Sequence, residues 1–152
     1  MKKYLPIVLF AVLSVMILAF IFGMSLQSRE ASGNTSSGIV AAIKPIIDPN
    51  NRIPEDTFHY AVRKLAHFTE FCSLGICLWG FFASLGKLVG GRFVTFPMFA
   101  ALLSAVTDEF IQYFSDRGSM VTDVVLDFIG SLFGIGIAVL AHWLYKKLFA
   151  KA

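Results

Sequence analysis

The sequence reads LPIVLFAVLSVMILAFIFGMS from Leu5 to Ser25, and this stretch contains no charged residue. A helix that crosses the hydrocarbon core of a bilayer needs about 20 predominantly apolar residues, so the stretch is long enough to span a membrane. Lys2 and Lys3 precede it, as in a secretory signal peptide. The apolar run is too long for a typical signal core, and no A-x-A cleavage site follows. We therefore expect a retained transmembrane helix.

The composition of the whole chain is that of a membrane protein. Of 152 residues, 57% are hydrophobic and only 15% are charged, whereas soluble domains have about 45–50% apolar and 25% charged residues. These figures exclude a disordered chain, a secreted disulfide scaffold and an ordinary water-soluble enzyme. Cys72 and Cys77 point in different directions on one helix, so we expect no disulfide. The cations do not cluster on a soluble face, and we expect no nucleic-acid partner.

Three further stretches qualify as membrane spans, over residues 58–85, 93–114 and 121–145. The connections over residues 86–92 and 115–120 are short, so consecutive helices must be antiparallel. The sequence therefore predicts an all-α, polytopic membrane protein in which residues 1–152 form a single domain with four transmembrane helices in an antiparallel bundle.

The long connection between the first two spans contains a second pattern. It begins with a polar, Ser-rich loop over residues 28–37. Apolar residues then recur at roughly helical spacing, and Pro49 follows them. This spacing predicts a short amphipathic segment on the outer leaflet, although Pro45 is unfavourable within a helix. The apolar residues are Ile39, Val40, Ile43, Ile46 and Ile47.

The distribution of charge predicts the orientation in the membrane. If the N-terminus is cytoplasmic, the cytoplasmic segments contain seven cations and no acid, while all ten acids lie on the other side or in its half of the membrane. Cytoplasmic segments of membrane proteins are enriched in Lys and Arg. We therefore expect a multi-pass protein of the cell membrane with both termini in the cytoplasm. The seven cations are Lys2, Lys3, Lys87, Arg92, Lys146, Lys147 and Lys151.

Ionisable and amide side chains within three of the spans are the main evidence for a functional site. Such groups are costly in a membrane and usually mark function. The helical rise places them at one depth, in the outer leaflet, whereas the inner halves of the spans carry no charge. We therefore predict one polar chamber that opens outward. Its residues are Arg63, His67 and Glu70 on one helix face of the second span, Asp108, Glu109 and Gln112 in the third, and Asp123 and Asp127 in the fourth.

With Lys64 and Arg117 included, the chamber holds five acids against three bases. This set cannot remain fully ionised in a low dielectric without another cation. A divalent metal ion, protonated carboxyl groups or an ammonium-bearing ligand would balance the charge. The carboxylates available to a metal are those of Glu70, Asp108, Glu109 and Asp123.

Simpler structural roles compete for some of these residues. Lys64 fits an interfacial anchor whose ammonium group reaches the lipid phosphates. Asp123 fits the start of a helix, where a carboxylate is favourable. Gly130 and Gly134 form a small-xxx-small pattern that is typical of close helix packing. The other polar residues of the chamber exceed what packing requires.

Three motifs in this sequence resemble those of the VanZ-like family of bacterial membrane proteins. Residues 67–71 read HFTEF and resemble H-F-x-E-[YF], while residues 108–112 read DEFIQ and match D-E-x-x-Q. A third pattern, R-x5-D-x3-N-x2-G-x3-G, begins at Arg117 and includes Asp123, Gly130 and Gly134. Residues 25–28, SLQS, are also similar. The order and spacing of the motifs extend the resemblance over nearly the whole chain.

The resemblance implies a role in the bacterial cell envelope. The namesake of the family accompanies glycopeptide-resistance genes and is associated with tolerance to teicoplanin, a lipid-tailed antibiotic that acts outside the membrane. Many relatives occur without a resistance cluster, so antibiotic resistance transfers less securely than the fold. This sequence departs from the third pattern at Asp127, where the family often has Asn. The aspartate adds a negative charge to the chamber where an asparagine would be neutral.

Three functions fit an outward chamber. In the first, the protein binds or remodels a lipid-linked cell-wall precursor or a lipoglycopeptide, with Arg63 and Arg117 binding phosphate and Gln112, Asp123 and Asp127 completing the ligand site. The second is an intramembrane hydrolase or transferase, in which His67, Glu70, Asp108 and Glu109 hold a metal or transfer protons. A proton-coupled transporter ranks last, because the inner halves of the spans offer no charged path. We expect the first function, with membrane lipids as further partners.

Overall fold

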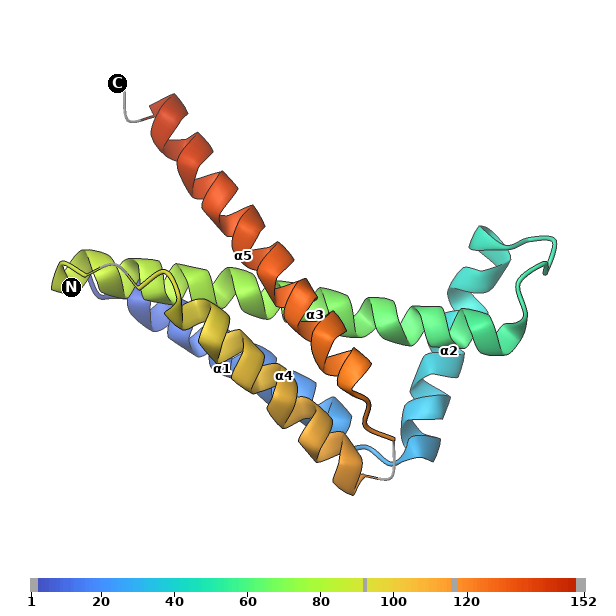
Figure 1. Cartoon of the computed structure of the whole chain (residues 1–152). Helices are drawn as coiled ribbons and strands as arrows, with labels where there is room; N and C mark the ends of the chain where they lie inside the picture. Colours follow the sequence, from blue (N-terminus) through green and yellow to red (C-terminus); the bar gives the residue numbers. More distant parts are fainter. Residues whose placement is uncertain (1–2, 92, 116–117, 150–152) are drawn as a thin grey trace.

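The structure is a computed structural model that describes residues 3–91, 93–115 and 118–149. These residues form five helices and no strand (Figure 1). The prediction of an all-α protein is therefore confirmed. In chain order, the helices are α1 (Leu5–Ser25), α2 (Arg29–Ile47), α3 (Glu55–Val89), α4 (Phe96–Phe114) and α5 (Val121–Phe149).

The helix boundaries follow from local sequence. Pro6 and Pro97 lie in the first turns of α1 and α4, where the missing N–H of proline has no helical acceptor to lose. Gly90 ends α3 with a φ of 72°, a left-handed conformation that glycine adopts readily. Beyond it, the Gly91 N–H donates to the Gly86 carbonyl at 3.1 Å. The predicted span over residues 58–85 therefore extends at both ends.

Helix α2 corrects the prediction of a Ser-rich loop over residues 28–37. The hydroxyl of Ser28 accepts a hydrogen bond from the Ala31 N–H at 3.3 Å and caps the helix. Thr35, Ser36 and Ser37 each donate to a carbonyl of the preceding turn. These hydroxyls are satisfied within the helix, so a polar composition does not prevent helix formation here.

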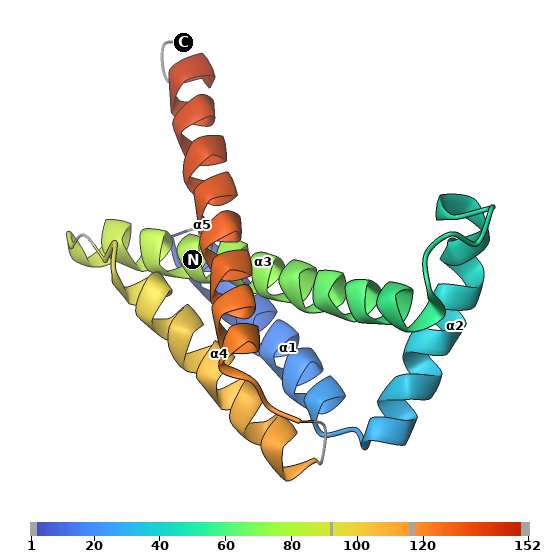
Figure 2. The same ribbon diagram turned by 45° about the vertical axis from the view of Figure 1, so that its right-hand side comes forward.

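Helix α3 is the centre of the fold, because each of the other four helices contacts it. Helices α1 and α4 also contact each other, and α5 packs on both α3 and α4. Both views show α2 beside the first part of α3, and the last part of α5 directed away from the other helices (Figures 1 and 2). The hydrophobic core lies between α1, α3 and α4 and consists of Ile21, Phe71, Leu74, Leu78, Ala101 and Ala105.

Three of the described helices, α1, α3 and α5, are long and apolar enough to cross a membrane. Many large apolar side chains on these helices face outward, among them Val15, Phe133 and Trp143. Such a surface is typical of contact with lipid. Helix α4 is not among the three, because Asp108, Glu109 and Gln112 lower the hydropathy of its 19 residues. The predicted membrane span over residues 93–114 is therefore not confirmed.

Helices α3 and α5 approach each other at small residues. A Cβ atom at Gly134 would overlap the Cys72 carbonyl oxygen, and one at Gly75 would overlap that of Ser131. The Ser131 hydroxyl donates to the Phe71 carbonyl at 3.2 Å across the same contact. The close-packing role expected of Gly134 is confirmed. This contact fixes the rotation of α5 and so determines which of its side chains face α3 and α4.

Candidate functional site between helices α3, α4 and α5

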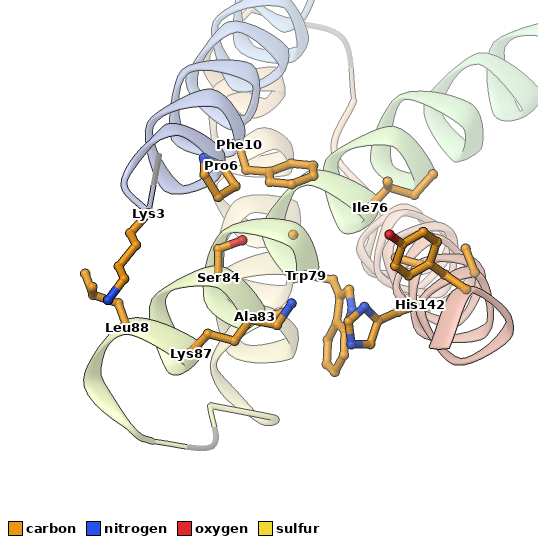
Figure 3. Close-up of a pocket in the computed structure, with 14 residues that line it drawn as sticks. Lys3, Pro6, Phe10, Ile76, Trp79, Ala83, Ser84, Lys87, Leu88 and His142 are labelled. Atoms are coloured by element: carbon orange, nitrogen blue, oxygen red, sulfur yellow. The ribbon is translucent and has the colours of Figure 1, made fainter. Parts of the chain in front are cut away.

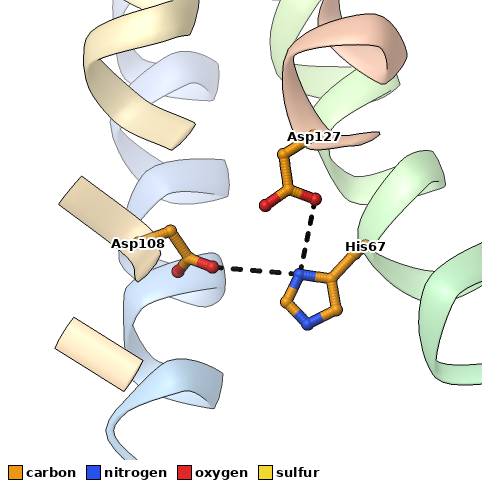
Figure 4. Close-up of side chains that lie close together, drawn as sticks. All are labelled: His67, Asp108 and Asp127. Carbon is orange, nitrogen blue, oxygen red and sulfur yellow. Dashed lines mark ion pairs between the residues drawn. The ribbon is translucent and has the colours of Figure 1, made fainter. Parts of the chain in front are cut away.

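Three polar side chains, each from a different helix, come together near the contact between α3 and α5. His67 of α3 lies between Asp108 of α4 and Asp127 of α5 (Figure 4). The His67 Nδ1 atom is 3.8 Å from Asp108 Oδ2 and 3.7 Å from Asp127 Oδ1. Both aspartates are fully buried, while the His67 side chain keeps 17% of its surface exposed. The group therefore reaches the surface of the protein through His67.

Hydrogen bonds hold the Asp108 carboxylate in place from two helices. Ser25, the last residue of α1, donates its hydroxyl to Asp108 Oδ1 at 2.6 Å. Gln112, one turn further along α4, donates its amide to Asp108 Oδ2 at 2.7 Å. Bonds to a charged acceptor are stronger than those between neutral groups. Asp108 is therefore anchored at the meeting point of α1 and α4.

Glu109 connects this network to the segment that precedes α5. Its Oε1 atom accepts a hydrogen bond from Gln112 Nε2 at 3.1 Å, and its Oε2 atom accepts one from the Met120 N–H at 3.0 Å. The second bond satisfies a backbone donor just before α5 begins at Val121. Glu109 thus helps to fix the position at which α5 starts. Glu109 does not belong to the group formed by His67, Asp108 and Asp127.

Asp127 differs from the other buried acids. Neither of its carboxylate oxygens accepts a hydrogen bond from any described residue. Buried polar groups are normally hydrogen-bonded, and an exception needs an explanation. The close group across the site is the His67 imidazole.

An ion pair between α3 and α5 lies beside the three residues. The Lys64 ammonium group contacts the Asp123 carboxylate, and both side chains are mostly buried. Lys64 also lies over the Tyr60 ring, 5.1 Å from its centroid. The interpretation of Lys64 as an interfacial anchor was incomplete, because its charge is used within the protein. Asp123 lies in the first turn of α5, as expected, and it also binds this lysine.

The remaining predicted site residues are placed differently. The Arg63 side chain is exposed on α3, and Arg117 lies outside the described residues. Glu70 is partly buried one turn beyond His67 on α3. In the described chain, one group of potential metal ligands has its ligand atoms within 4.8 Å of one another. Of the four carboxylates predicted as metal candidates, this group contains only that of Asp108. The other members of that group are His67 and Asp127.

One residue of the site, Ser25, was not identified as a site residue from the sequence. Ser25 ends an uncharged span, and its only signal was the family-like SLQS motif over residues 25–28. Lys64 was counted among the bases of the predicted chamber, with an interfacial anchor as its competing role. Cys72 and Cys77 are free, as expected, and neither belongs to the polar network.

A separate groove of about 780 Å³ lies at the other end of the molecule, between the beginning of α1 and the second halves of α3 and α5 (Figure 3). It lies where the second half of α5 diverges from α3 (Figures 1 and 2). Its lining is mostly apolar, with Phe10 and Trp79 among its side chains, and it includes Lys87 and His142. None of the residues predicted for the site lines this groove.

The fold and the site together define the class of the protein. It is a helical membrane protein that holds histidine and carboxylate groups between helices with apolar outer surfaces. The chain belongs to the VanZ/LLP1 family, which matches residues 10–142 and therefore includes all the site residues. No curated protein and no solved structure matches the chain.

Proposed function

We propose that this protein binds the polar part of an amphiphile at the outer surface of the bacterial membrane, and that it thereby contributes to tolerance of teicoplanin-type antibiotics. The amphiphile is a lipid-linked cell-wall component or a lipoglycopeptide. The observation that carries the proposal is the placement of His67 and the buried Asp108 and Asp127 between helices with apolar outer surfaces. Ionisable groups in such a position mark functional sites in membrane proteins, and membership of the VanZ/LLP1 family supports the choice of ligand.

The chemistry of the site suits binding of a charged head group. Lys64, His67 and Asp123 are each partly exposed, so a ligand can approach them from the surface. Carboxylates accept hydrogen bonds from ammonium groups and sugar hydroxyls. The exposed guanidinium of Arg63, on the same helix, suits a phosphate or carboxylate of the same ligand. The acyl chain of the ligand would remain among the surrounding lipids.

The proposal is tested by ligand binding to the full chain in lipid nanodiscs. The probes are teicoplanin and a lipid-linked peptidoglycan precursor, each measured against the wild type, His67→Asn and His59→Asn. His59 is a matched control, because it lies on α3 two turns before His67 and pairs with Glu55 instead of the buried aspartates. We expect His67→Asn to lose about tenfold or more in affinity for at least one probe, which corresponds to about 1.4 kcal/mol. Equal affinities for the two histidine variants would contradict the proposed site.

A further inference from the structure

Asp127 is the residue whose surroundings need a further explanation. Asp108 and Asp127 are both fully buried, but only Asp108 has hydrogen bonds, which come from Ser25 and Gln112. The Asp127 carboxylate accepts none from the described residues and is directed at the His67 ring (Figure 4). A buried polar group without a hydrogen bond loses its hydration without compensation. A further positively charged group beside Asp127 would compensate for this loss.

Charge balance indicates what kind of group this is. Two buried carboxylates, Asp108 and Asp127, face one imidazole, and the nearby Lys64 is engaged by Asp123. Buried charges persist only when they are paired or bind a metal. A divalent cation would match the two negative charges of the aspartates. A neutral imidazole would then supply a nitrogen ligand.

The distances between the side chains also fit a metal ion. A first-row divalent ion holds nitrogen and oxygen ligands about 2.0–2.2 Å away, so two of its ligand atoms are at most about 4.4 Å apart. The His67 Nδ1 atom lies 3.8 Å and 3.7 Å from the two carboxylate oxygens. All three potential ligand atoms lie within 4.8 Å of one another. A small rotation of one carboxylate would bring the remaining pair into range.

The groups around the site supply the support that metal ligands require. Metal-binding carboxylates are usually oriented by hydrogen bonds from outer groups. Ser25 and Gln112 provide such bonds to both oxygens of Asp108. The three candidate ligands lie on three different helices, and the α3–α5 contact at Gly134 limits their relative movement. All three candidate ligands therefore lie on packed helices, which hold them in place.

We propose that His67, Asp108 and Asp127 form a binding site for a divalent transition-metal ion that joins α3, α4 and α5. Imidazole favours Zn²⁺, Fe²⁺ and Ni²⁺, whereas an all-oxygen site favours Mg²⁺ or Ca²⁺. The histidine ligand thus indicates a transition metal. The bound ion would link the helices and neutralise the aspartates, leaving coordination positions for water or a ligand on the exposed side of His67. The metal site is independent of the identity of the amphiphile proposed above.

The direct test measures Zn²⁺ binding to the full chain in detergent after EDTA treatment and dialysis. We compare the wild type with Asp127→Asn, which keeps the shape of the side chain, and with Asp56→Asn, an exposed acid at the start of α3. We expect one bound Zn²⁺ in the wild type and in Asp56→Asn, with no competition from a tenfold excess of Mg²⁺. Loss of an outer-shell group alone weakens metal binding about 10–100-fold, so Asp127→Asn should weaken it by about 100-fold or more.

Two further measurements do not depend on the affinity of the variant. Zn²⁺ should raise the thermal unfolding temperature of the wild type, because it binds only the folded state, and it should leave that of Asp127→Asn unchanged. Co²⁺ in the wild-type site should give visible absorption bands that change in His67→Asn. The proposal is overturned if the EDTA-treated wild type binds no more Zn²⁺ than Asp127→Asn, or if Co²⁺ gives no bands in the wild type.

Discussion

Asp108 and Asp127 show how two equally buried carboxylates come to differ. Asp108 receives hydrogen bonds from Ser25 of α1 and from Gln112 of its own helix. Asp127 receives neither of these bonds and faces the imidazole of His67. Spacing along each helix placed both residues in the predicted polar chamber. Their different surroundings depend on which side chains the neighbouring helices bring into contact. Ser25 in particular lies 83 residues before its partner Asp108, so no local pattern could connect the two.

The Lys64–Asp123 ion pair should contribute to stability. Both side chains are mostly buried, so the pair is screened less than a pair on the surface. We expect a coupling free energy of about 0.5–1 kcal/mol. The measurement is a double-mutant cycle with Lys64→Gln and Asp123→Asn, using equilibrium unfolding in mixed micelles. If the effects of the two single variants simply add, the ion pair makes no contribution.

At the scale of the helices, the sequence was most informative where a stretch is uniformly apolar. The bounds predicted for the first span are those of α1, and the start of the last span is that of α5. The polar helices were harder to predict. The first turns of α3 and the Ser-rich half of α2 lack a strong hydrophobic pattern. Ser28 caps α2, and α2 and α3 contact each other.

The close contact between α3 and α5 gives a prediction with an internal control. Gly134 faces the Cys72 carbonyl, whereas a Cβ atom at Gly136 would meet nothing within 4 Å. Gly134→Ala should destabilise the protein by about 1–3 kcal/mol, because overpacking separates the helices. Gly136→Ala should be neutral or stabilise it by up to about 1 kcal/mol, because alanine favours helix. Unfolding in mixed micelles checks both variants, and equal effects would contradict the close approach of the helices.

The connection between α2 and α3 should respond to acid through Asp48. Hydrogen bonds from the Ile53 and Arg52 N–H groups, at 2.8 Å and 2.9 Å, lower the pKa of the Asp48 carboxyl below its ordinary value. The contribution of these bonds to stability is therefore complete above the unfolded-state pKa of about 3.9. It is lost as the pH falls through the lower folded-state pKa.

NMR titration of the Arg52 and Ile53 amides in detergent measures this effect. We expect a midpoint below about 3.9 in the wild type and no such transition in Asp48→Asn. The difference in unfolding temperature between the two proteins should also shrink as the pH is lowered through the midpoint. A midpoint at or above the ordinary aspartate value would contradict the hydrogen-bonded structure of this connection.

On the scale of the whole molecule, the site and the groove occupy opposite ends of the helices. Ser25, His67, Asp108 and Asp127 lie at one end, and the groove that includes Lys87 lies at the other. The asymmetric distribution of charges predicted that the polar residues gather in one half of the spans, but no prediction of the groove followed from the sequence. The sequence could not predict how α5 rotates against α3, and this rotation selects Asp127 over Asp123 as the partner of His67.

The orientation of the protein in the membrane can be tested by labelling introduced cysteines from outside the cell. The excess of Lys and Arg in the terminal segments and in the α3–α4 connection predicts that these face the cytoplasm, with α2 outside. In a Cys72→Ala/Cys77→Ala background, Ser37→Cys on α2 should react with a membrane-impermeant maleimide in intact cells. Lys147→Cys near the end of α5 should react only after the membrane is opened. The reverse pattern would place the polar site on the cytoplasmic side.

The proposed function depends on the group formed by His67, Asp108 and Asp127. The most direct test is the teicoplanin tolerance of bacterial cells that express the wild type, His67→Asn or His59→Asn at equal abundance in the membrane. We expect the wild type and His59→Asn to raise tolerance equally and His67→Asn to leave it unchanged. Equal tolerance with all three proteins would show that this group is not required, and no increase with the wild type would contradict the proposed role itself.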